Sequence, residues 1–195
     1  MSPPMSFILY ASYLFLCFFA IPFLRADTAT FAGGCFWCVQ ADFDNVKGVT
    51  KTTAGYTGGD KVDSTYKEVS AGGTGHVEAV QIDYDPKVVT YDQLLDVYWH
   101  NIDPTRNNGQ FCDNGSQYRP VIFYHNKTQK ALAEAYKQRM IEEKKIQPIL
   151  VEILPAKTFY PAEEYHQEYY KKNPVKYKFY RTTCGRDRRL RELWQ

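Results

Sequence analysis

The chain has 195 residues, of which 44% are hydrophobic and 16% aromatic, and its formal net charge is +2. This apolar content is enough to build a folded core, so a chain that is disordered throughout is excluded. The small net charge argues against a nucleic-acid-binding protein, because such domains are usually strongly basic.

The first 26 residues differ from the rest of the chain. Phe7–Leu24 carries no charge and ends just before Ala26, which is typical of a secretory signal peptide cleaved after that residue. No Lys or Arg precedes the apolar run, and its length reaches the lower limit for a membrane-spanning helix. An uncleaved anchor formed by residues 7–24 is therefore the alternative, whereas a lipid-modified Cys17 is disfavoured by the bulky residues before it. In each case residues 27–195 are expected to form one exported domain, periplasmic or secreted.

Strand and helix patterns alternate along residues 27–195. The first three are a strand at Thr28–Ala32, a helix from Phe36 to near Gly48 and a strand at Val49–Tyr56. A second alternating segment, His76–Tyr84, places Glu78 on the same face as Val80, Ile82 and Tyr84. The later elements are a helix from Tyr91 to about His100, a strand at Pro120–Tyr124, a helix from Asn126 to about Lys145, a strand at Val151–Leu154 and a helix near Ala162–Lys172.

This order predicts an α+β domain, with a two-layer mixed sheet and helices mostly on one face. We expect a split βαβ (ferredoxin-like) core, long loops and a basic C-terminal tail. The loop at residues 101–119 is long for a compact domain, which favours a functional role for it.

A reactive cysteine is predicted at the start of the first helix. In Gly33-Gly34-Cys35-Phe36-Trp37-Cys38 the glycines leave a strand and enter the helix. Unpaired backbone N–H groups and the helix dipole favour a thiolate at Cys35, which lowers the pKa of the thiol. The alternative is an ordinary helix start with two aromatic core residues and a buried thiol.

Cys35 and Cys38 also form a C-x-x-C pair. A redox dithiol, half of a zinc site and a coincidence are the three interpretations. Zinc needs a second pair of ligands, and Cys112, Cys184 and His76 occur singly, so no metal is expected. The four cysteines after residue 26 also allow two structural disulfides, as in many exported proteins.

The chain resembles the A-type peptide methionine sulfoxide reductases. The similarity begins at Gly34-Cys35-Phe36-Trp37 and runs in the same order from about residue 29 to residue 175. The other matching segments are Gly55-Tyr56-Thr57-Gly58-Gly59, Thr65-Tyr66-Lys67-Glu68-Val69, Gly75-His76-Val77-Glu78-Ala79-Val80, Tyr84-Asp85-Pro86, Asp113-Asn114-Gly115-Ser116-Gln117-Tyr118-Arg119 and Tyr165-His166-Gln167 with Asn173-Pro174.

The resemblance implies a chemistry that suits these residue types. Cys35 would attack the sulfur of a methionine S-sulfoxide, free or in an oxidised protein, and Glu78 would protonate the departing oxygen. A carboxyl group among apolar neighbours tends to stay protonated, as this role requires. Tyr66 and Tyr118 match hydroxyl donors to the oxygen, and Asp113 matches a further polar group. Phe36 and Trp37 match the cage for the methionine methyl group, whereas His76 is expected to be structural.

Attack would leave Cys35 as a sulfenic acid, which a second thiol must convert into a disulfide. We rank Cys184, in the basic tail, as the first candidate, Cys38 as the second and Cys112 as the third. Cys38 departs from the commoner family pattern, which has Gly at that position. The resemblance implies a monomer without cofactor, re-reduced by thioredoxin or by an exported thioredoxin-like protein.

Two other classes of protein fit part of the pattern. A general thiol–disulfide oxidoreductase would use Cys35 and Cys38, but it leaves Tyr66, Glu78 and Asp113 without a role. A non-enzymatic secreted module held together by disulfides would have no free thiol in its mature form.

Overall fold

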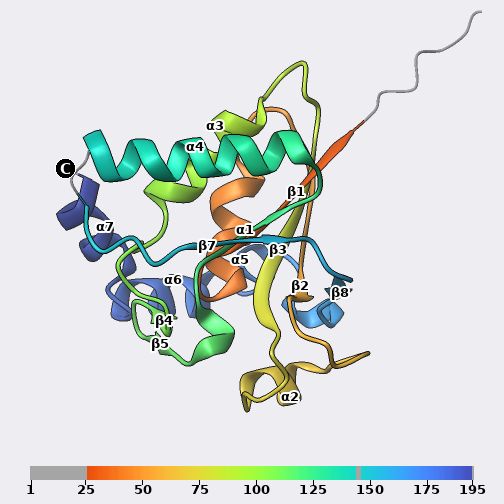
Figure 1. Ribbon diagram of the computed structural model, residues 1–195. Coiled ribbons are helices and arrows are strands. Elements are labelled where there is room, and N and C mark those ends of the chain that lie inside the picture. The colour runs from red at the N-terminus through yellow and green to blue at the C-terminus, as the bar shows by residue number, and fades with distance from the viewer. Residues whose placement is uncertain (1–25, 144–145, 195) are drawn as a thin grey trace, which may run out of the picture.

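The computed structural model describes residues 26–143 and 146–194 (Figure 1). The predicted leader, residues 1–26, therefore lies almost entirely outside the described residues. The strands are β1 (Asp27–Ala32), β2 (Val49–Thr57), β3 (Val77–Tyr84), β4 (Gly109–Gln110), β5 (Asp113–Asn114), β6 (Val121–Tyr124), β7 (Glu152–Pro155) and β8 (Tyr160–Pro161). The α-helices are α1 (Phe36–Asp44), α2 (Tyr66–Ser70), α3 (Tyr91–His100), α4 (Lys127–Glu143), α5 (Tyr169–Lys172), α6 (Pro174–Thr183) and α7 (Arg186–Trp194).

Six strands form one mixed sheet in the order β7-β6-β1-β3-β2-β8. All neighbours are antiparallel except β6 and β7, which run parallel. The chain order β1-α1-β2-β3-α3-β6, with β1 and β3 at the centre of the sheet, is the split βαβ arrangement. The predicted α+β fold with a mixed sheet and a ferredoxin-like core is confirmed.

The two faces of the sheet are covered differently. The larger core combines strand residues such as Phe31 and Ile82 with Phe43 from α1, Trp99 from α3 and Tyr136 from α4. The other face has a smaller core, covered by β7 and the segment that follows it. This core comprises Ala32, Val77, Ala79, Val121 and Phe123, packed against Leu154, Ala156 and Phe159. The helices therefore lie mostly on one face, as predicted, and Figure 1 shows α3 and α4 together on that side.

Several segments differ from the elements that the sequence predicts, including α2 and β8, which were not predicted from the sequence. The helix expected near residues 162–172 is limited to a 3₁₀ turn at Glu164–His166 and the short α5. Glu168 between them has a left-handed backbone (φ 50°), which ends any continuous helix. The loop at 101–119 contains the β4–β5 hairpin and a 3₁₀ turn at Ser116–Tyr118.

The basic tail is also folded, as helices α6 and α7. Pro174 occupies the first turn of α6, where its missing N–H group costs nothing. Helix α6 contacts the β4–β5 hairpin through Tyr180 and Asp113 and α1 through Arg181 and Asp42. The start of α7 contacts α1 through Arg186 and Asp42, and Figure 1 shows α6 and α7 on the side of the fold that carries the hairpin. No helix among the described residues is both long and apolar enough to cross a membrane.

Candidate active site

Cys35 is the residue that caps the N-terminus of α1. Gly34 before it has φ +87°, and a Cβ atom there would lie 2.7 Å from Cβ of Gln110. Both the left-handed backbone and the close approach require glycine at this position. The glycine thus permits β1 to turn sharply into α1 with Cys35 at the bend, as the sequence predicts.

Two carboxyl groups accept hydrogen bonds from the backbone N–H groups at the start of this helix. The Phe36 N–H donates to Oε2 of Glu78 at 3.0 Å, and the Cys35 N–H donates to the carboxyl group of Asp113. Asp113 also accepts a hydrogen bond of 2.6 Å from the Tyr180 hydroxyl group. The helix N-terminus therefore orients carboxyl groups around the cysteine, which satisfies donors that the helix itself leaves unpaired.

The electrostatic environment of Cys35 is opposite to the one predicted. Burial raises the pKa of Cys35 well above its ordinary value, and the interaction with Cys38 and the charges of Glu78 and Asp113 raise it further. The expected lowering by the helix N-terminus is wrong for this resting state, because desolvation disfavours the thiolate and the N–H groups already serve carboxyl oxygens.

Cys38 lies one turn further along α1, and its environment favours the thiolate. The hydrogen bond from the Cys35 thiol is the main cause that lowers the pKa of Cys38, and the positive charges of Arg186 and Arg181 lower it as well. The thiolate of the pair therefore forms first at Cys38.

Glu78 has the character of a general acid. Burial raises the pKa of Glu78 to about 8, although the hydrogen bond from Phe36 opposes the rise. Glu78 is 2% exposed and lies on the helix-covered face of β3, the face that the sequence predicts. At neutral pH its carboxyl group is mostly protonated and can donate a proton inside the site.

All seven residues predicted for catalysis and substrate binding line one small cavity of about 80 Å³. Burial raises the pKa of Tyr66 to about 12 and also raises the pKa of Tyr118, so both phenols stay protonated and can donate hydrogen bonds. The lining residues are Cys35, Phe36, Trp37, Tyr66, Glu78, Asp113, Tyr118 and, in addition, Tyr180.

The aromatic wall includes residues that the sequence did not single out. Trp37 stacks on Tyr169 with ring centres 3.8 Å apart, and its indole N–H donates to Nδ1 of His166 at 3.0 Å. The ring of Tyr180 meets Trp37 edge-on at 5.8 Å. His166 belongs to a matching family segment, so that segment was the available signal, whereas Tyr180 lies outside every matching segment.

His76 is structural, as predicted. It is 2% exposed, its Nδ1 accepts the Gly59 N–H at 3.1 Å, and its Nε2 lies 2.6 Å from the carbonyl oxygen of Lys61. These contacts fix the loop after β2.

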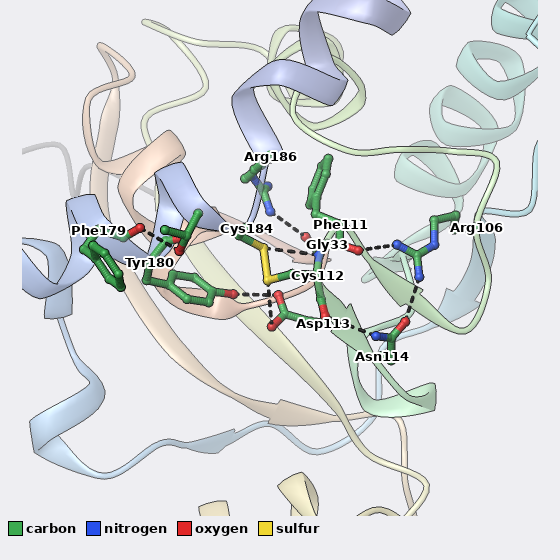
Figure 2. Close-up of a disulfide and its surroundings, with 11 residues drawn as sticks. Gly33, Arg106, Phe111, Cys112, Asp113, Asn114, Phe179, Tyr180, Cys184 and Arg186 are labelled. Atoms are coloured by element: carbon green, nitrogen blue, oxygen red, sulfur yellow. Dashed lines mark hydrogen bonds between the residues drawn. A yellow bond between two sulfur atoms is a disulfide. The ribbon is translucent and has the colours of Figure 1, made fainter.

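The four cysteines among the described residues divide into two pairs. Cys35 and Cys38 are free and buried, and Cys112 and Cys184 form a disulfide across 72 residues of sequence (Figure 2). The disulfide links the β4–β5 hairpin to the end of α6 and lies beside Asp113 of the cavity. Its two sulfur atoms are joined to each other and are not available as metal ligands.

Comparison with known proteins agrees with this site. The sequence profile of the family "Peptide methionine sulfoxide reductase" matches residues 27–195. The chain is 52% identical over 171 residues to the peptide methionine sulfoxide reductase MsrA of Bacillus subtilis, with 87% of this chain and 97% of that protein covered. It is 51% identical over 170 residues to the protein of the same name from Listeria monocytogenes, with 87% and 96% covered.

Solved structures show the same relationship. The reduced form of Mxr1 from Saccharomyces cerevisiae superposes with a TM-score of 0.72 and 34% identity, over 77% of this chain and 87% of that one. Methionine sulfoxide reductase A of Corynebacterium diphtheriae gives a TM-score of 0.69 and 33% identity, over 77% and 76%. The chain therefore belongs to the A-type peptide methionine sulfoxide reductase family and is a thiol-dependent oxidoreductase that reduces methionine sulfoxide to methionine.

Proposed function

We propose that Cys35 attacks the sulfur atom of a methionine S-sulfoxide bound in the small cavity, while Glu78 protonates the sulfoxide oxygen. The observation that carries this proposal is the placement of a buried thiol and a protonated carboxyl group in one cavity, with Glu78 hydrogen-bonded to the residue that follows Cys35. The attack forms a bond between the Cys35 sulfur and the sulfoxide sulfur. The protonated oxygen then passes to the Cys35 sulfur as the S–O bond and the new S–S bond break, so methionine leaves and Cys35 becomes a sulfenic acid. The thiol proton of Cys35 replaces the proton that Glu78 gives up, so the step is balanced.

The other lining residues orient the substrate. Phe36 and Trp37 hold the methyl group, because apolar rings fit a small apolar substituent. Tyr66 and Tyr118 donate hydrogen bonds to the oxygen, and Asp113 holds the Cys35 N–H and Tyr180 at the rim. These donors stabilise the negative charge that develops on oxygen in the transition state.

We propose Cys38, in place of Cys184, as the thiol that resolves the sulfenic acid. Cys38 is free, buried beside Cys35 and set up as a thiolate, whereas Cys184 is bonded to Cys112. Attack by Cys38 forms the Cys35–Cys38 disulfide and releases water.

The reductant is proposed to be thioredoxin or an exported thioredoxin-like protein. Cys35 is 7% exposed and Cys38 is 2% exposed, whereas Cys112 lies at the surface. An external dithiol therefore meets the Cys112–Cys184 disulfide first. Reduction of that pair yields two thiols, which can in turn reduce Cys35–Cys38 by exchange.

We propose that the protein is exported, acts as a monomer and repairs methionine residues damaged by oxidants. The apolar leader and the Cys112–Cys184 disulfide support export, because such bonds persist in oxidising compartments. The cavity is complete within one chain, which supports a monomer. Mass spectrometry of the mature N-terminus distinguishes a cleaved leader from an anchor, and light scattering measures the oligomeric state.

A single-turnover experiment tests the chemistry. The reduced protein is mixed with methionine S-sulfoxide, and methionine and the cysteine products are measured. Cys35→Ser is expected to release no methionine. Cys38→Ser is expected to release one methionine per chain and to accumulate sulfenic acid at Cys35.

Methionine release by Cys35→Ser would exclude Cys35 as the nucleophile. A Cys35–Cys184 disulfide in wild type and Cys38→Ser would restore Cys184 as the resolving thiol. Reactivation of a scrambled-disulfide protein, with no action on the sulfoxide, would instead indicate a general thiol–disulfide oxidoreductase.

A further inference from the structure

Arg186, at the start of α7, has a buried guanidinium group that contacts α1, the helix that begins directly after Cys35. The residue is 2% exposed. Its Nη1 donates to the Gly33 carbonyl oxygen at 3.2 Å, and its Nη2 donates to the Asn101 carbonyl oxygen at 2.6 Å and to Asp42 at 3.3 Å. A buried cation is costly unless it is well paired, so three acceptors are the expected compensation.

The same guanidinium group touches the surroundings of both cysteine pairs. It stacks on the ring of Phe111, 4.6 Å from the ring centre, and Phe111 directly precedes Cys112. Figure 2 shows Arg186 beside this ring and hydrogen-bonded to Gly33, with the Cys112–Cys184 disulfide nearby. Arg186 itself follows Cys184 by two residues, and Gly33 precedes the Gly34-Cys35 turn.

Asp42, the carboxylate partner of Arg186, lies one helical turn after Cys38 on α1. Arg181 from α6 binds the other oxygen of Asp42 at 2.8 Å, so two guanidinium groups share one carboxylate beside Cys38. Arg181 also binds Asp187 on α7 at 2.9 Å, so the cluster holds two positive and two negative charges. Asp187 is 48% exposed, so water screens its charge more than that of the buried Arg186. The other titratable groups that act on Cys38 are Cys35 on α1, Glu78 on β3, and Tyr177 and Tyr180 on α6.

We propose that Arg186 is a positioning residue of the resolving step, whose buried charge holds Cys38 as the thiolate that attacks Cys35. This inference rests on the proposed function, in which Cys35 is the nucleophile and Cys38 the resolving thiol. The Cys38 sulfur forms the S–S bond and is oxidised, the S–O bond of the Cys35 sulfenic acid breaks, and the hydroxide leaves as water with a proton from Glu78. Arg186 itself forms no bond with a reacting atom.

The direction of the electrostatic effect agrees with this geometry. Arg186 and Arg181 both lower the pKa of Cys38, and Asp42 raises it. The shape of the Arg186 side chain also fits this position. Its planar guanidinium group contacts two carbonyl oxygens and a carboxylate at once, which the ammonium group of a Lys side chain cannot do in this geometry.

The experiment separates the two chemical steps. Reduced wild-type protein, Arg186→Gln and Arg189→Gln are mixed with methionine S-sulfoxide between pH 6 and pH 9. Methionine is measured by rapid quench, the sulfenic acid is trapped with dimedone, and peptide mapping gives the rate of Cys35–Cys38 disulfide formation. Arg189 is the matched control, because it lies on the same helix and binds Asp103 and Glu192 instead of Asp42.

In Arg186→Gln we expect methionine release to persist and disulfide formation to slow by about tenfold near pH 7, because the pKa of Cys38 rises and a smaller fraction of it is thiolate. The pH midpoint of disulfide formation moves up, and its rate recovers at pH 9. Arg186→Lys, which keeps the charge, recovers part of the rate at pH 7. Arg189→Gln behaves as wild type.

A purely structural role would lower the melting temperature of Arg186→Gln and leave the pH midpoint unchanged, which would overturn the inference. If Arg186→Gln does not fold, Asp42→Asn replaces it, and its pH midpoint is expected to move down. An unchanged or raised midpoint in Asp42→Asn would also overturn the inference. Failure of the proposed function is recognised separately, because wild type would then release no methionine or form no Cys35–Cys38 disulfide.

Discussion

The Oε2 atom of Glu78 accepts the backbone N–H of Phe36 at 3.0 Å, and so links the acid on β3 to the helix that begins at Cys35. Because Phe36 directly follows Cys35, the bond fixes the carboxyl group of the proposed acid close to the nucleophile. It also favours the carboxylate, yet burial outweighs it and keeps the pKa of Glu78 at about 8. The acid is thus held in place and remains protonated.

Replacement of Glu78 by Gln is expected to slow methionine formation by about 10²- to 10⁴-fold, the usual contribution of a positioned acid. Gln keeps an oxygen for the Phe36 N–H, so the loss reports the missing proton. In wild type the single-turnover rate should fall as pH rises through about 8, because Glu78 loses its proton there. Rapid-quench measurements check both effects, with Glu134→Gln on the exposed side of α4 as the control. A wild-type rate in Glu78→Gln would remove Glu78 from the mechanism.

The same group should make folding stability depend on pH. The pKa of Glu78 in the folded protein lies above the ordinary glutamate value of about 4.3, so the folded state binds the proton more tightly. The contribution of Glu78 to the free energy of unfolding is complete below the ordinary pKa and is lost as pH rises through about 8. Between these two values the loss is at most about 1.4 kcal/mol per pH unit. Urea unfolding should show that, from pH 5 to pH 8, the free energy of unfolding of wild type falls relative to that of Glu78→Gln. A difference that stays constant with pH would contradict the assignment.

Tyr66→Phe and Tyr118→Phe are each expected to lower the single-turnover rate by up to about 10²-fold, as the loss of a donor to a developing oxyanion does. The double variant should lose more than either single variant, because each phenol can partly replace the other. Steady-state and single-turnover rates measure the effect, and Tyr124→Phe outside the cavity is the control. If the double variant keeps the wild-type rate, the two phenols serve only as walls of the cavity.

Gly34→Ala is expected to destabilise the protein more than Gly72→Ala, although both glycines have similar positive φ angles of +87° and +82°. The backbone cost of about 1–3 kcal/mol is shared by both. Only at Gly34 does the new Cβ meet another atom closely, at 2.7 Å from Gln110, whereas nothing lies within 4 Å at Gly72. The difference in melting temperature between the variants measures the steric part, and equal losses would show that backbone conformation alone requires Gly34.

The features that depend on local sequence pattern could be predicted without the structure. Alternation along β3 placed Glu78 on the face of Val80 and Ile82, and the Gly33-Gly34 pair placed Cys35 at the bend into α1. Side-chain direction follows from a period of two in a strand, and a helix start follows from its glycines, so neither needs knowledge of distant residues. The resemblance then connected Tyr66, Asp113 and Tyr118 to the same site.

Features that depend on burial, or on contacts between residues far apart in the sequence, could be seen only in the folded protein. The Cys112–Cys184 bond spans 72 residues, and Tyr180 and Arg186 reach the site from helices α6 and α7, where the sequence alone predicts only a basic tail. The pKa values of the two thiols also depend on the fold. A helix N-terminus predicts a lowered pKa for Cys35, whereas burial and the charges of Glu78 and Asp113 raise it. The pKa of Cys38 is lowered instead, so the thiolate forms there first. Local spacing shows which groups a helix start offers, but the surrounding fold determines how far water is excluded from them and which charges they face.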